Sequence, residues 1–261
     1  MESLSAFYIF CIGACLGSFM NVLTCRLPRG CSIVTPPSSC PSCRVRIRQF
    51  DNIPIISWFI LKGRCRNCGA RISIMYPIAE ILTGLLFLAA YLKLGMTSQM
   101  YLAFSIIFFG LAAAFADLMT ALDTENFECG IIPDGIVYTG LGVGVVLSYF
   151  ANDSIMFPVY GAVTGFLGLF VPSYLFKLIR KKEGMGGGDI KLTAMFGAML
   201  GAKSVFFIIF GSAFFGAVIG IAAQIILKKK NMMIPFGPFI TLASIIYLFY
   251  GKTLDALLFG I

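Results

Sequence analysis

The sequence predicts an all-α polytopic membrane protein, and its composition, its hydropathy and the placement of its charges all favour that class. Of its 261 residues, 59% are hydrophobic and 12% are charged, and the mean hydropathy is +0.91. Soluble domains carry about 25% charged residues, so this chain has too few charges to cover a water-facing surface of its size. Apolar stretches of about 20 residues, the length that crosses a bilayer, recur along the chain.

About eight transmembrane helices are expected. Their residue ranges are 4–25, 74–92, 100–117, 134–150, 157–178, 190–202, 204–227 and 232–251. The stretch 190–202 is short and rich in Gly and Met, which is typical of a segment that enters the bilayer only partway. The first stretch lacks the basic start of a signal peptide and runs directly into a charged loop, so we expect a retained span.

The basic residues set the expected orientation. Of 20 Lys and Arg residues, nine lie at 26–71, five at 177–191 and three at 228–230. With the N-terminus outside, these 17 residues lie in or beside cytoplasmic loops, as the positive-inside bias requires. The net charge of +8 then reflects topology and suits an anionic lipid bilayer. No basic stripe alternates with aromatic residues, so nucleic acid is not an expected partner.

The absence of histidine excludes whole classes of catalytic site. Ser-His-Asp and Cys-His catalysis, HExxH zinc sites and an imidazole general base all require it. Any catalytic chemistry must therefore use carboxylates, thiols, lysine, tyrosine or hydroxyl groups.

Four of the nine cysteines predict a zinc-ribbon-like cytoplasmic loop between the first and second spans. They form two C-x2-C pairs with 21 residues between them, namely Cys40 with Cys43 and Cys65 with Cys68. Two such pairs complete a tetrahedral all-sulfur shell around one zinc ion, and a closed shell is structural rather than catalytic. Nearby Arg44, Arg64 and Arg66 are expected to favour the thiolate form.

Two other states of these cysteines are open. A pair of disulfides is disfavoured because the expected orientation places this loop in the reducing cytoplasm. Four unligated thiols are disfavoured because the cysteines occur in two regularly spaced pairs. Cys11, Cys15 and Cys25 lie in or at the end of the first span and are expected to be small packing residues. The pattern assigns no role to Cys31 and Cys129.

Four of the 12 acidic residues lie in or at the edge of a predicted span, where ionisable groups are costly and usually functional. These are Glu80, Asp117, Asp134 and Asp189. The positions of Asp134 and Asp189 also suit helix N-caps, and for Asp134 we favour that interpretation. Glu80 suits either a hydrogen-bonded structural role or a functional one.

Asp189 follows three glycines, Gly186-Gly187-Gly188. Glycine permits unusual backbone angles and close approach of another segment. No GK[ST] sequence follows, so a phosphate-binding P-loop is not expected. A carboxylate on such a turn, beside a carboxylate from another helix, suits an aspartic protease. Two facing carboxylates share one proton, so one activates a water while the other protonates the scissile carbonyl.

Motifs along nearly the whole chain together resemble the type IV prepilin peptidases, bacterial inner-membrane enzymes of the GxGD aspartic protease class. They are Gly17-Ser18-Phe19-Met20-Asn21-Val22, Arg26-Leu27-Pro28, Cys40 with Cys43, Asp51-Asn52-Ile53-Pro54, Leu61-Lys62-Gly63-Arg64-Cys65-Arg66-Asn67-Cys68, Tyr76-Pro77 with Glu80, Ile132-Pro133-Asp134, Gly186-Gly187-Gly188-Asp189-Ile190-Lys191 and Pro235-Phe236-Gly237-Pro238. Each motif is weak alone, whereas their order and spacing together are specific.

The resemblance implies a bifunctional enzyme with an active site that faces the cytoplasm. It would cleave basic leaders from prepilins or pseudopilins after a glycine. It would then methylate the new N-terminus with S-adenosylmethionine as donor, although residues of the donor pocket are not implied. The catalytic pair maps onto Asp189 and, by its D-L-x-T context, Asp117, with Asp123 as the alternative.

The sequence departs from the family pattern through an added stretch before Ile132-Pro133-Asp134. This stretch contains Asp123, Glu125 and Glu128, which we expect either to attract a basic leader or to form a solvated loop.

The expected domains are 1–25 as the first span, 26–73 as the zinc loop and 74–261 as the transmembrane peptidase. Three other functions are open: a leader peptidase without methylation, a transporter whose carboxylates relay protons, and a zinc-ribbon scaffold. A scaffold leaves the glycine turn before Asp189 unexplained.

Overall fold

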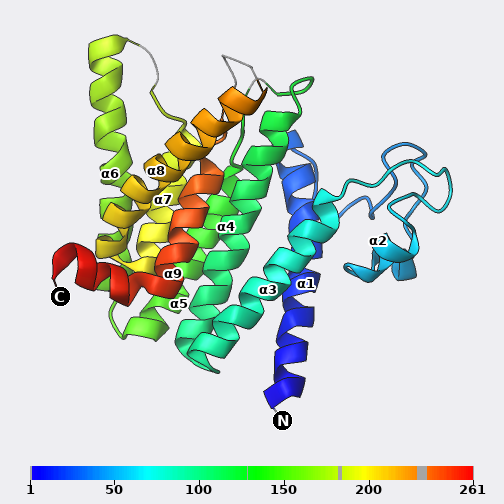
Figure 1. Ribbon diagram of the computed structural model, residues 1–261, viewed down its shortest axis with the longest axis horizontal. Helices are drawn as coiled ribbons and strands as arrows, with labels where there is room; N and C mark the ends of the chain where they lie inside the picture. The colour runs from blue at the N-terminus through cyan, green and yellow to red at the C-terminus, as the bar shows by residue number, and fades with distance from the viewer. Residues whose placement is uncertain (1, 128, 182–183, 228–233, 261) are drawn as a thin grey trace. The chain divides into compact units, whose positions relative to one another are not determined.

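The computed structural model describes residues 2–127, 129–181, 184–227 and 234–260, and in these residues every regular element is helical (Figure 1). The longer helices are α1 (Glu2–Arg26), α3 (Met75–Leu94), α4 (Ser98–Leu122), α5 (Asp134–Asn152), α6 (Met156–Arg180), α7 (Gly187–Leu200), α8 (Ala202–Leu227) and α9 (Gly237–Phe259). The loop after α1 contains the short helices η1 (Leu27–Arg29), η2 (Gln49–Asn52) and α2 (Ile56–Ile60). The predicted all-α class is confirmed. Glu128 and the basic run 228–230 lie outside the described residues.

Seven of these helices are long and apolar enough to cross a membrane: α1, α3, α4, α5, α6, α8 and α9. The expected span at 190–202 is the shorter helix α7, which has 14 residues. At about 1.5 Å per residue it extends about 21 Å, less than the roughly 30 Å hydrocarbon core. Its side chains from Leu192 to Met199 are all buried, so other helices surround α7.

The chain divides into two compact units, Met1–Met96 and Thr97–Ile261. In the first unit, α1 packs along α3. A Cβ at Gly13 would lie 2.9 Å from the Cα of Gly84, and one at Gly17 would lie 2.8 Å from the Cα of Glu80. The GxxxG spacing on α1 therefore brings the two helix backbones close together, as small residues do in membrane helices.

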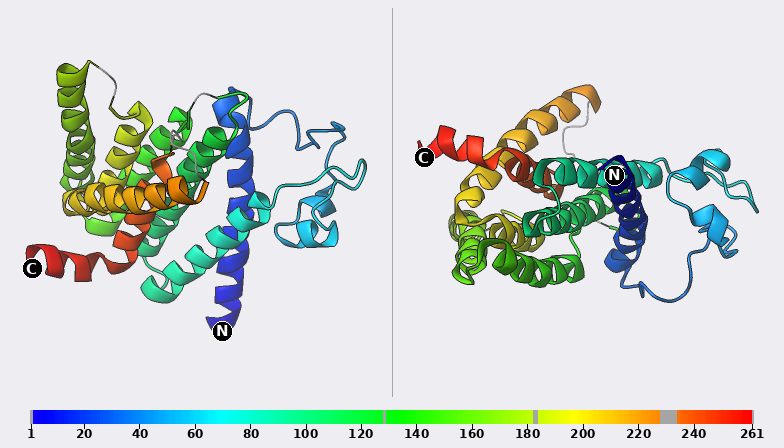
Figure 2. Two further views of the ribbon diagram at one scale, coloured as in Figure 1. Left: turned by 45° about the horizontal axis from the view of Figure 1, so that its top comes forward. Right: turned by 90° about the horizontal axis from the view of Figure 1, so that it is seen from below.

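In the second unit, α4 and α7 carry the most buried surfaces. α5 and α9 pack on α4, and α6 packs on α7 along a line of glycines (Figures 1 and 2). A Cβ at Gly165 would lie 2.9 Å from the Cα of Ala194, so any larger residue would force α6 and α7 apart. The helix α7 is too short to cross a bilayer alone, and the closely packed neighbouring helices enclose it.

The last helix differs most from its predicted range. The sequence indicated a span at 232–251, whereas α9 begins at Gly237 and ends at Phe259. Phe236 is the N-cap residue and Pro238 lies in the first turn, where its fixed φ and missing N–H are tolerated. The helix therefore begins within the Pro235-Phe236-Gly237-Pro238 motif, which proves important for the site.

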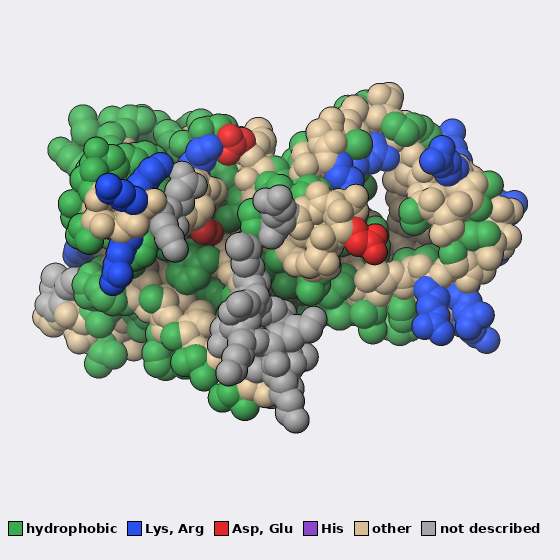
Figure 3. Space-filling view, turned by 90° about the horizontal axis from the view of Figure 1, so that it is seen from above, with side chains coloured by type: hydrophobic (Ala, Val, Ile, Leu, Met, Phe, Trp, Pro, Cys, Tyr) green, Lys and Arg blue, Asp and Glu red, His purple; other side chains and the backbone are tan. Residues whose placement is uncertain are grey.

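Four helix ends of the second unit meet on one side: the C-terminal end of α4 and the N-terminal ends of α5, α7 and α9 (Figure 1). On this side the space-filling view shows gathered basic side chains and few acidic ones, one of them recessed among hydrophobic groups (Figure 3). Carboxylates that are distant in sequence are thus brought to one end of the helix bundle.

Candidate active site and metal centre

Asp117 lies five residues before the end of α4, and its side chain is buried. Its Oδ2 atom accepts a 2.8 Å hydrogen bond from the backbone N–H of Gly237, the first residue of α9. The first N–H groups of a helix have no partner within the helix and favour a negative charge. The start of α9 therefore stabilises the ionised form of Asp117.

The chain that follows α4 folds back over this carboxylate. The hydroxyl of Thr120 donates to the carbonyl of Ala116 at 2.7 Å and accepts from the N–H of Ile131 at 2.7 Å. This brings Gly130 against the Asp117 side chain, where a Cβ would collide with Oδ1. Gly130 is therefore required for space around the carboxylate.

Asp189 is the third residue of α7, and Gly186 is the N-cap residue. Burial and, to a smaller extent, the negative charge of Asp117 together raise the pKa of the Asp189 carboxyl to about 7. The structure therefore brings Asp117 and Asp189 within electrostatic reach of each other.

The glycine turn before Asp189 provides space rather than unusual backbone angles. None of its three glycines has a positive φ. A Cβ at Gly188 would lie 3.0 Å from the Cβ of Ile132, and one at Gly186 would lie 3.4 Å from Oδ2 of Asp189. Close approach was expected and is confirmed, whereas the expected unusual backbone angles are absent.

Asp134 does not cap its helix, so the capping interpretation was wrong. It is the first residue of α5, Pro133 occupies the N-cap position, and no side chain caps this end. Its Oδ1 atom instead accepts from Nζ of Lys191 at 2.7 Å, and Nζ also lies 5.4 Å from the centre of the Tyr138 ring. Asp134 therefore links the start of α5 to the first turn of α7, two residues beyond Asp189.

Asp123 follows the last residue of α4 and turns towards its own loop. Its carboxylate accepts hydrogen bonds of 2.8 and 3.1 Å from the side-chain amide of Asn126. Glu125 is exposed in the same loop, and Glu128 lies outside the described residues. Of the two candidates for the first aspartate, Asp117 lies within electrostatic reach of Asp189, whereas Asp123 bonds to its own loop.

The four paired cysteines form one cluster in the first unit. The Sγ atoms of Cys40, Cys43, Cys65 and Cys68 all lie within 4.8 Å of one another. The Sγ atoms of Cys40 and Cys68 are 3.8 Å apart, which is not a disulfide distance. With Zn–S bonds of about 2.3 Å, the sulfurs of a tetrahedral site lie about 3.8 Å apart. The donor set and its spacing therefore fit one zinc ion.

Each half of this centre is a tight turn of the same form. The N–H of Cys40 donates to the carbonyl of Val45 at 3.0 Å, and the N–H of Cys65 donates to the carbonyl of Ala70 at 2.8 Å. The residue after each pair has a positive φ, 58° at Arg44 and 72° at Gly69. The two knuckles predicted from the C-x2-C spacing are thus present.

Backbone amides favour the thiolates that a metal requires. N–H groups of Cys43 and Ser42 donate to the sulfur of Cys40 and lower its pKa to about 6. The N–H of Val45 likewise lowers the pKa of Cys43. We expected neighbouring arginines to have this effect, but Arg66 pairs with Asp51 instead.

The Asp51–Arg66 pair joins η2 to the second knuckle. Nη2 of Arg66 lies 2.6 Å from Oδ1 of Asp51, and Nε lies 2.9 Å from Oδ2. The guanidinium group lowers the pKa of the Asp51 carboxyl through these bonds. A bidentate pair of this kind fixes geometry as well as charge.

Glu80 makes buried hydrogen bonds within the first unit. Its buried carboxylate accepts a 2.7 Å hydrogen bond from the backbone N–H of Ile55 and a further bond from the Ser18 hydroxyl. It thus joins α3 to α1 and to the turn before α2. Cys25, expected only to pack, also has its sulfur 3.5 Å from the hydroxyl of Tyr76 on α3.

Comparisons with known proteins agree with this arrangement. The family model for the bacterial peptidase A24 N-terminal domain matches residues 11–94, and that for the type IV leader peptidase family matches residues 111–221. A prepilin leader peptidase/N-methyltransferase of Bacillus subtilis is 35% identical over 94% of both chains. The chain belongs to the type IV leader peptidase family.

Relatives with the same name come from other organisms. That of Pseudomonas aeruginosa is 34% identical over 92% of this chain and 88% of its own length. That of Myxococcus xanthus is 35% identical over 84% of this chain, and the match spans 63% of that relative. No solved structure matches the chain.

The leader peptidase match includes Asp117 and Asp189 but ends before Gly237. Sequence reasoning quoted the motif that contains Gly237 and used Thr120 only as part of the D-L-x-T context, but it assigned neither residue a role, and it overlooked Gly130. The available signal was that Gly130 and Gly237 are glycines, which permit close approach of another segment. In the structure each stands where a larger side chain would meet the Asp117 carboxylate.

Proposed function

We propose that this chain removes the leader peptides of type IV prepilins and then methylates the amino group that cleavage exposes. The placement of Asp117 within electrostatic reach of Asp189, at the same end of the helices, carries the cleavage half of this proposal. The name shared by the relatives, prepilin leader peptidase/N-methyltransferase, supports both halves.

The two aspartates have different roles in the proposed cleavage. Asp117 is the general base, because the Gly237 N–H stabilises its ionised form. Asp189 keeps a proton near neutral pH, because burial and the charge of Asp117 raise its pKa to about 7. Asp117 takes a proton from a water molecule while that water attacks the scissile carbonyl. Asp189 gives its proton to the carbonyl oxygen.

The four-cysteine centre is proposed to hold one zinc ion as a structural element. Cys40, Cys43, Cys65 and Cys68 would all be ligands, which leaves no open position for water or substrate. The ion would fix the loop between α1 and α3 rather than take part in cleavage.

S-adenosylmethionine is the proposed source of the methyl group. When bound, it would supply an electrophilic methyl group to the new N-terminal nitrogen, which would give up a proton to solvent. A leader peptidase without this second activity is the alternative within the same family.

The helices of this multi-pass membrane protein are proposed to lie in a bacterial inner membrane, with the aspartates facing the cytoplasm. Support comes from the clusters of basic residues at 26–71 and 177–191. A transporter function is not favoured, because Asp117 lies in the last two turns of α4 rather than at its middle. By function we divide the chain into a first span at 1–25, a zinc loop at 26–73 and a peptidase at 74–261.

A reconstitution tests the proposal. The purified full chain is incubated in detergent with a prepilin, with and without S-adenosylmethionine. The masses of the products are then measured by mass spectrometry. We expect leader removal in both samples and one added methyl group only with the donor. A prepilin whose final leader glycine is replaced by a bulky residue is the control and should stay uncut. Absence of cleavage would refute the proposal, and cleavage that is never followed by methylation would support the peptidase-only alternative.

A further inference from the structure

The short helix α2, in the loop of the first unit, exposes an apolar face. The side chains of Ile56, Phe59 and Ile60 are 56%, 61% and 68% exposed, and their i, i+3 and i+4 spacing places them on one side of the helix. Ser57 lies off this face, where it is buried and its hydroxyl donates to the carbonyl of Phe50 at 2.7 Å. The helix is therefore turned so that its polar side chain faces the protein and its apolar side chains face outward.

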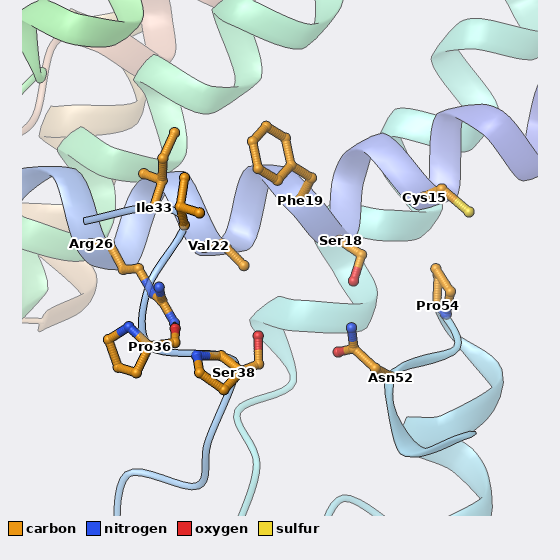
Figure 4. Close-up of a pocket in the computed structure, with 12 residues that line it drawn as sticks. Cys15, Ser18, Phe19, Val22, Arg26, Ile33, Pro36, Ser38, Asn52 and Pro54 are labelled. Atoms are coloured by element: carbon orange, nitrogen blue, oxygen red, sulfur yellow. The ribbon is translucent and has the colours of Figure 1, made fainter. Parts of the chain in front are cut away.

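Contacts with α1 and α3 give the depth at which α2 begins. The N–H of Ile55 donates to Oε2 of Glu80 at 2.7 Å, and Glu80 lies five residues, or about 7.5 Å, into α3. The 20 residues of α3 extend about 30 Å, which is the thickness of the hydrocarbon core. Asn52, which ends η2, points across a pocket towards Ser18, eight residues or about 12 Å before the end of α1 (Figure 4). The helix α2 accordingly lies level with the body of α3 in Figure 1, below the end of a membrane span.

The turn into α2 satisfies its backbone donors within the protein. The first N–H groups of a helix have no partner within the helix, and an unpaired group is costly where water is scarce. The N–H of Ile53 donates to the Ser57 hydroxyl at 3.0 Å, and the N–H of Ile55 donates to Glu80. The N–H groups of the next two residues donate to backbone carbonyls at 2.6 and 3.1 Å. Ile55 makes its bond with a φ of 65°, which β-branched residues rarely adopt, so this turn is strained in a way that suits a place without water.

The loop around α2 is strongly basic. Residues 26–73 contain nine Lys and Arg residues and one acidic residue, Asp51, whose charge is paired with an arginine. Lys62 and Arg64, which follow α2, are exposed, and Arg64 lies across an antiparallel bridge from the exposed Arg71. Positive charges beside an apolar face are typical of a helix that lies in the interface of an anionic membrane. A soluble acidic partner could meet these charges, but it would not reach a face that lies below the start of α3.

We propose that α2 is an interfacial helix that inserts its apolar face into an anionic lipid surface. Ile56, Phe59 and Ile60 lie among the upper parts of the acyl chains, and Lys62 and Arg64 reach the phosphates of the headgroups. The depth of about 7.5 Å along α3 agrees with the roughly 5–10 Å to which interfacial helices bury their apolar faces.

This anchor also fixes the place of the metal centre. Nε1 of Trp58 donates to the carbonyl of Ile72 at 3.3 Å, and the N–H of Ile72 donates to the carbonyl of Gly63 at 2.7 Å. The Trp58 ring covers Gly63, where a Cβ would lie 2.9 Å from the ring. These contacts join α2 to both sides of the pair Cys65 and Cys68. The four-cysteine loop is therefore held against the membrane rather than projecting from it.

The fluorescence of Trp58 tests the inference without a mutation, because this residue lies in α2 and is the only tryptophan of the chain. The full-length protein is reconstituted into vesicles of phosphatidylcholine and phosphatidylglycerol. Part of the phosphatidylcholine carries bromine atoms, which quench tryptophan, either near the headgroup end or near the tail end of its acyl chains. Acrylamide in the water phase measures exposure to solvent. Shallow bromines should quench Trp58 about twofold more than deep ones, since an interfacial helix lies near the headgroups.

Substitutions in the same vesicles test the apolar face itself. Ile60→Glu adds a charge to this face, so it should lower quenching by shallow bromines about twofold and raise quenching by acrylamide. Ile60→Leu keeps the face apolar and should behave as the wild type. Val45→Glu, which adds the same charge at an exposed position of the first knuckle, is the second control and should leave both kinds of quenching unchanged. Wild-type metal content in each variant checks that the loop is folded.

Quenching of wild-type Trp58 by acrylamide but not by lipid bromines would show that α2 faces water, and this result would overturn the proposal. Protection from both quenchers would overturn it as well, because protein would then cover the face. Vesicles without phosphatidylglycerol should quench less, and salt should weaken quenching only where the anionic lipid is present. Equal quenching in both kinds of vesicle would overturn the preference for anionic lipid. If Ile60→Glu does not fold, the wild-type measurement still decides, and none of these results depends on cleavage or methylation.

Discussion

The backbone N–H of Gly237 donates a 2.8 Å hydrogen bond to Oδ2 of Asp117, across 120 residues of sequence. This bond joins the start of α9 to the end of α4 and places a helix N-terminus on a buried carboxylate. It gives Asp117 a fixed orientation and a stabilised negative charge, which Asp189 does not share. The division into base and acid follows from this asymmetry.

Crowding the Asp117 carboxylate should impair leader cleavage. In Gly130→Ala the new methyl group would collide with Oδ1 of Asp117, so the carboxylate or the loop must move. A displacement of about 1 Å in a catalytic group costs on the order of 100-fold in rate, and we expect a loss of that size in kcat. Gly142→Ala is the control, because its Cβ would meet open space on α5. Equal rates for the two variants would show that Asp117 has room to adjust.

Cleavage should fall at alkaline pH. Asp189 must be protonated to act as the acid, and burial together with the charge of Asp117 raises its pKa to about 7. Below this pH the acid form dominates, and above it kcat/KM should fall towards a tenfold loss per pH unit. The pH profile of kcat/KM for a leader peptide checks this. A flat profile from about pH 6 to about pH 9, a range around this pKa of about 7, would assign the acid role elsewhere.

Removing the metal should loosen the loop between α1 and α3 without abolishing cleavage. Purified protein should contain one zinc per chain, and Cys40→Ser with Cys65→Ser should lose it because two of the four thiolates are gone. The loop between α1 and α3 should then be cut faster by an added protease, because the ion no longer joins the two knuckles. Cleavage should persist, because the described contacts of Asp117 and Asp189 all lie within residues 97–261. Disulfides among these cysteines in the native protein would contradict both the zinc site and the proposed orientation.

The acidic loop after α4 offers a test of substrate attraction. Neutralising it with Asp123→Asn, Glu125→Gln and Glu128→Gln should raise KM for a basic leader and weaken its dependence on salt. The turnover number kcat should change little, since Asp123 bonds to its own loop through Asn126. If KM and its salt dependence stay as in the wild type, this loop is simply a solvated surface.

The sequence could predict features that depend on short segments. The C-x2-C pairs specify their knuckles locally, and the metal cluster needs only two of them in one loop. Hydropathy likewise identified the long helices, because each must present apolar side chains along its whole length.

The sequence could not predict features that depend on tertiary packing. The Asp117–Gly237 bond joins residues 120 positions apart, and the Asp134–Lys191 pair joins residues 57 positions apart. The start of α9 was misplaced because hydropathy does not register helix-starting glycine and proline. The burial of α7 within the helix bundle was equally invisible, since an apolar segment of 14 residues suits either a core helix or part of a span.

Leader cleavage by three single variants, Asp117→Asn, Asp189→Asn and Asp123→Asn, tests the central claim most directly. Asparagine has nearly the shape of aspartate but cannot act as a general base or acid. Asp117→Asn and Asp189→Asn should each abolish cleavage, and together should be scarcely worse than either alone. Both should keep their zinc and still methylate a pilin that is already cleaved. Asp123→Asn should cleave at nearly the wild-type rate. Full cleavage by Asp189→Asn would contradict the aspartic protease account, and loss in Asp123→Asn with normal cleavage in Asp117→Asn would contradict the assignment of Asp117.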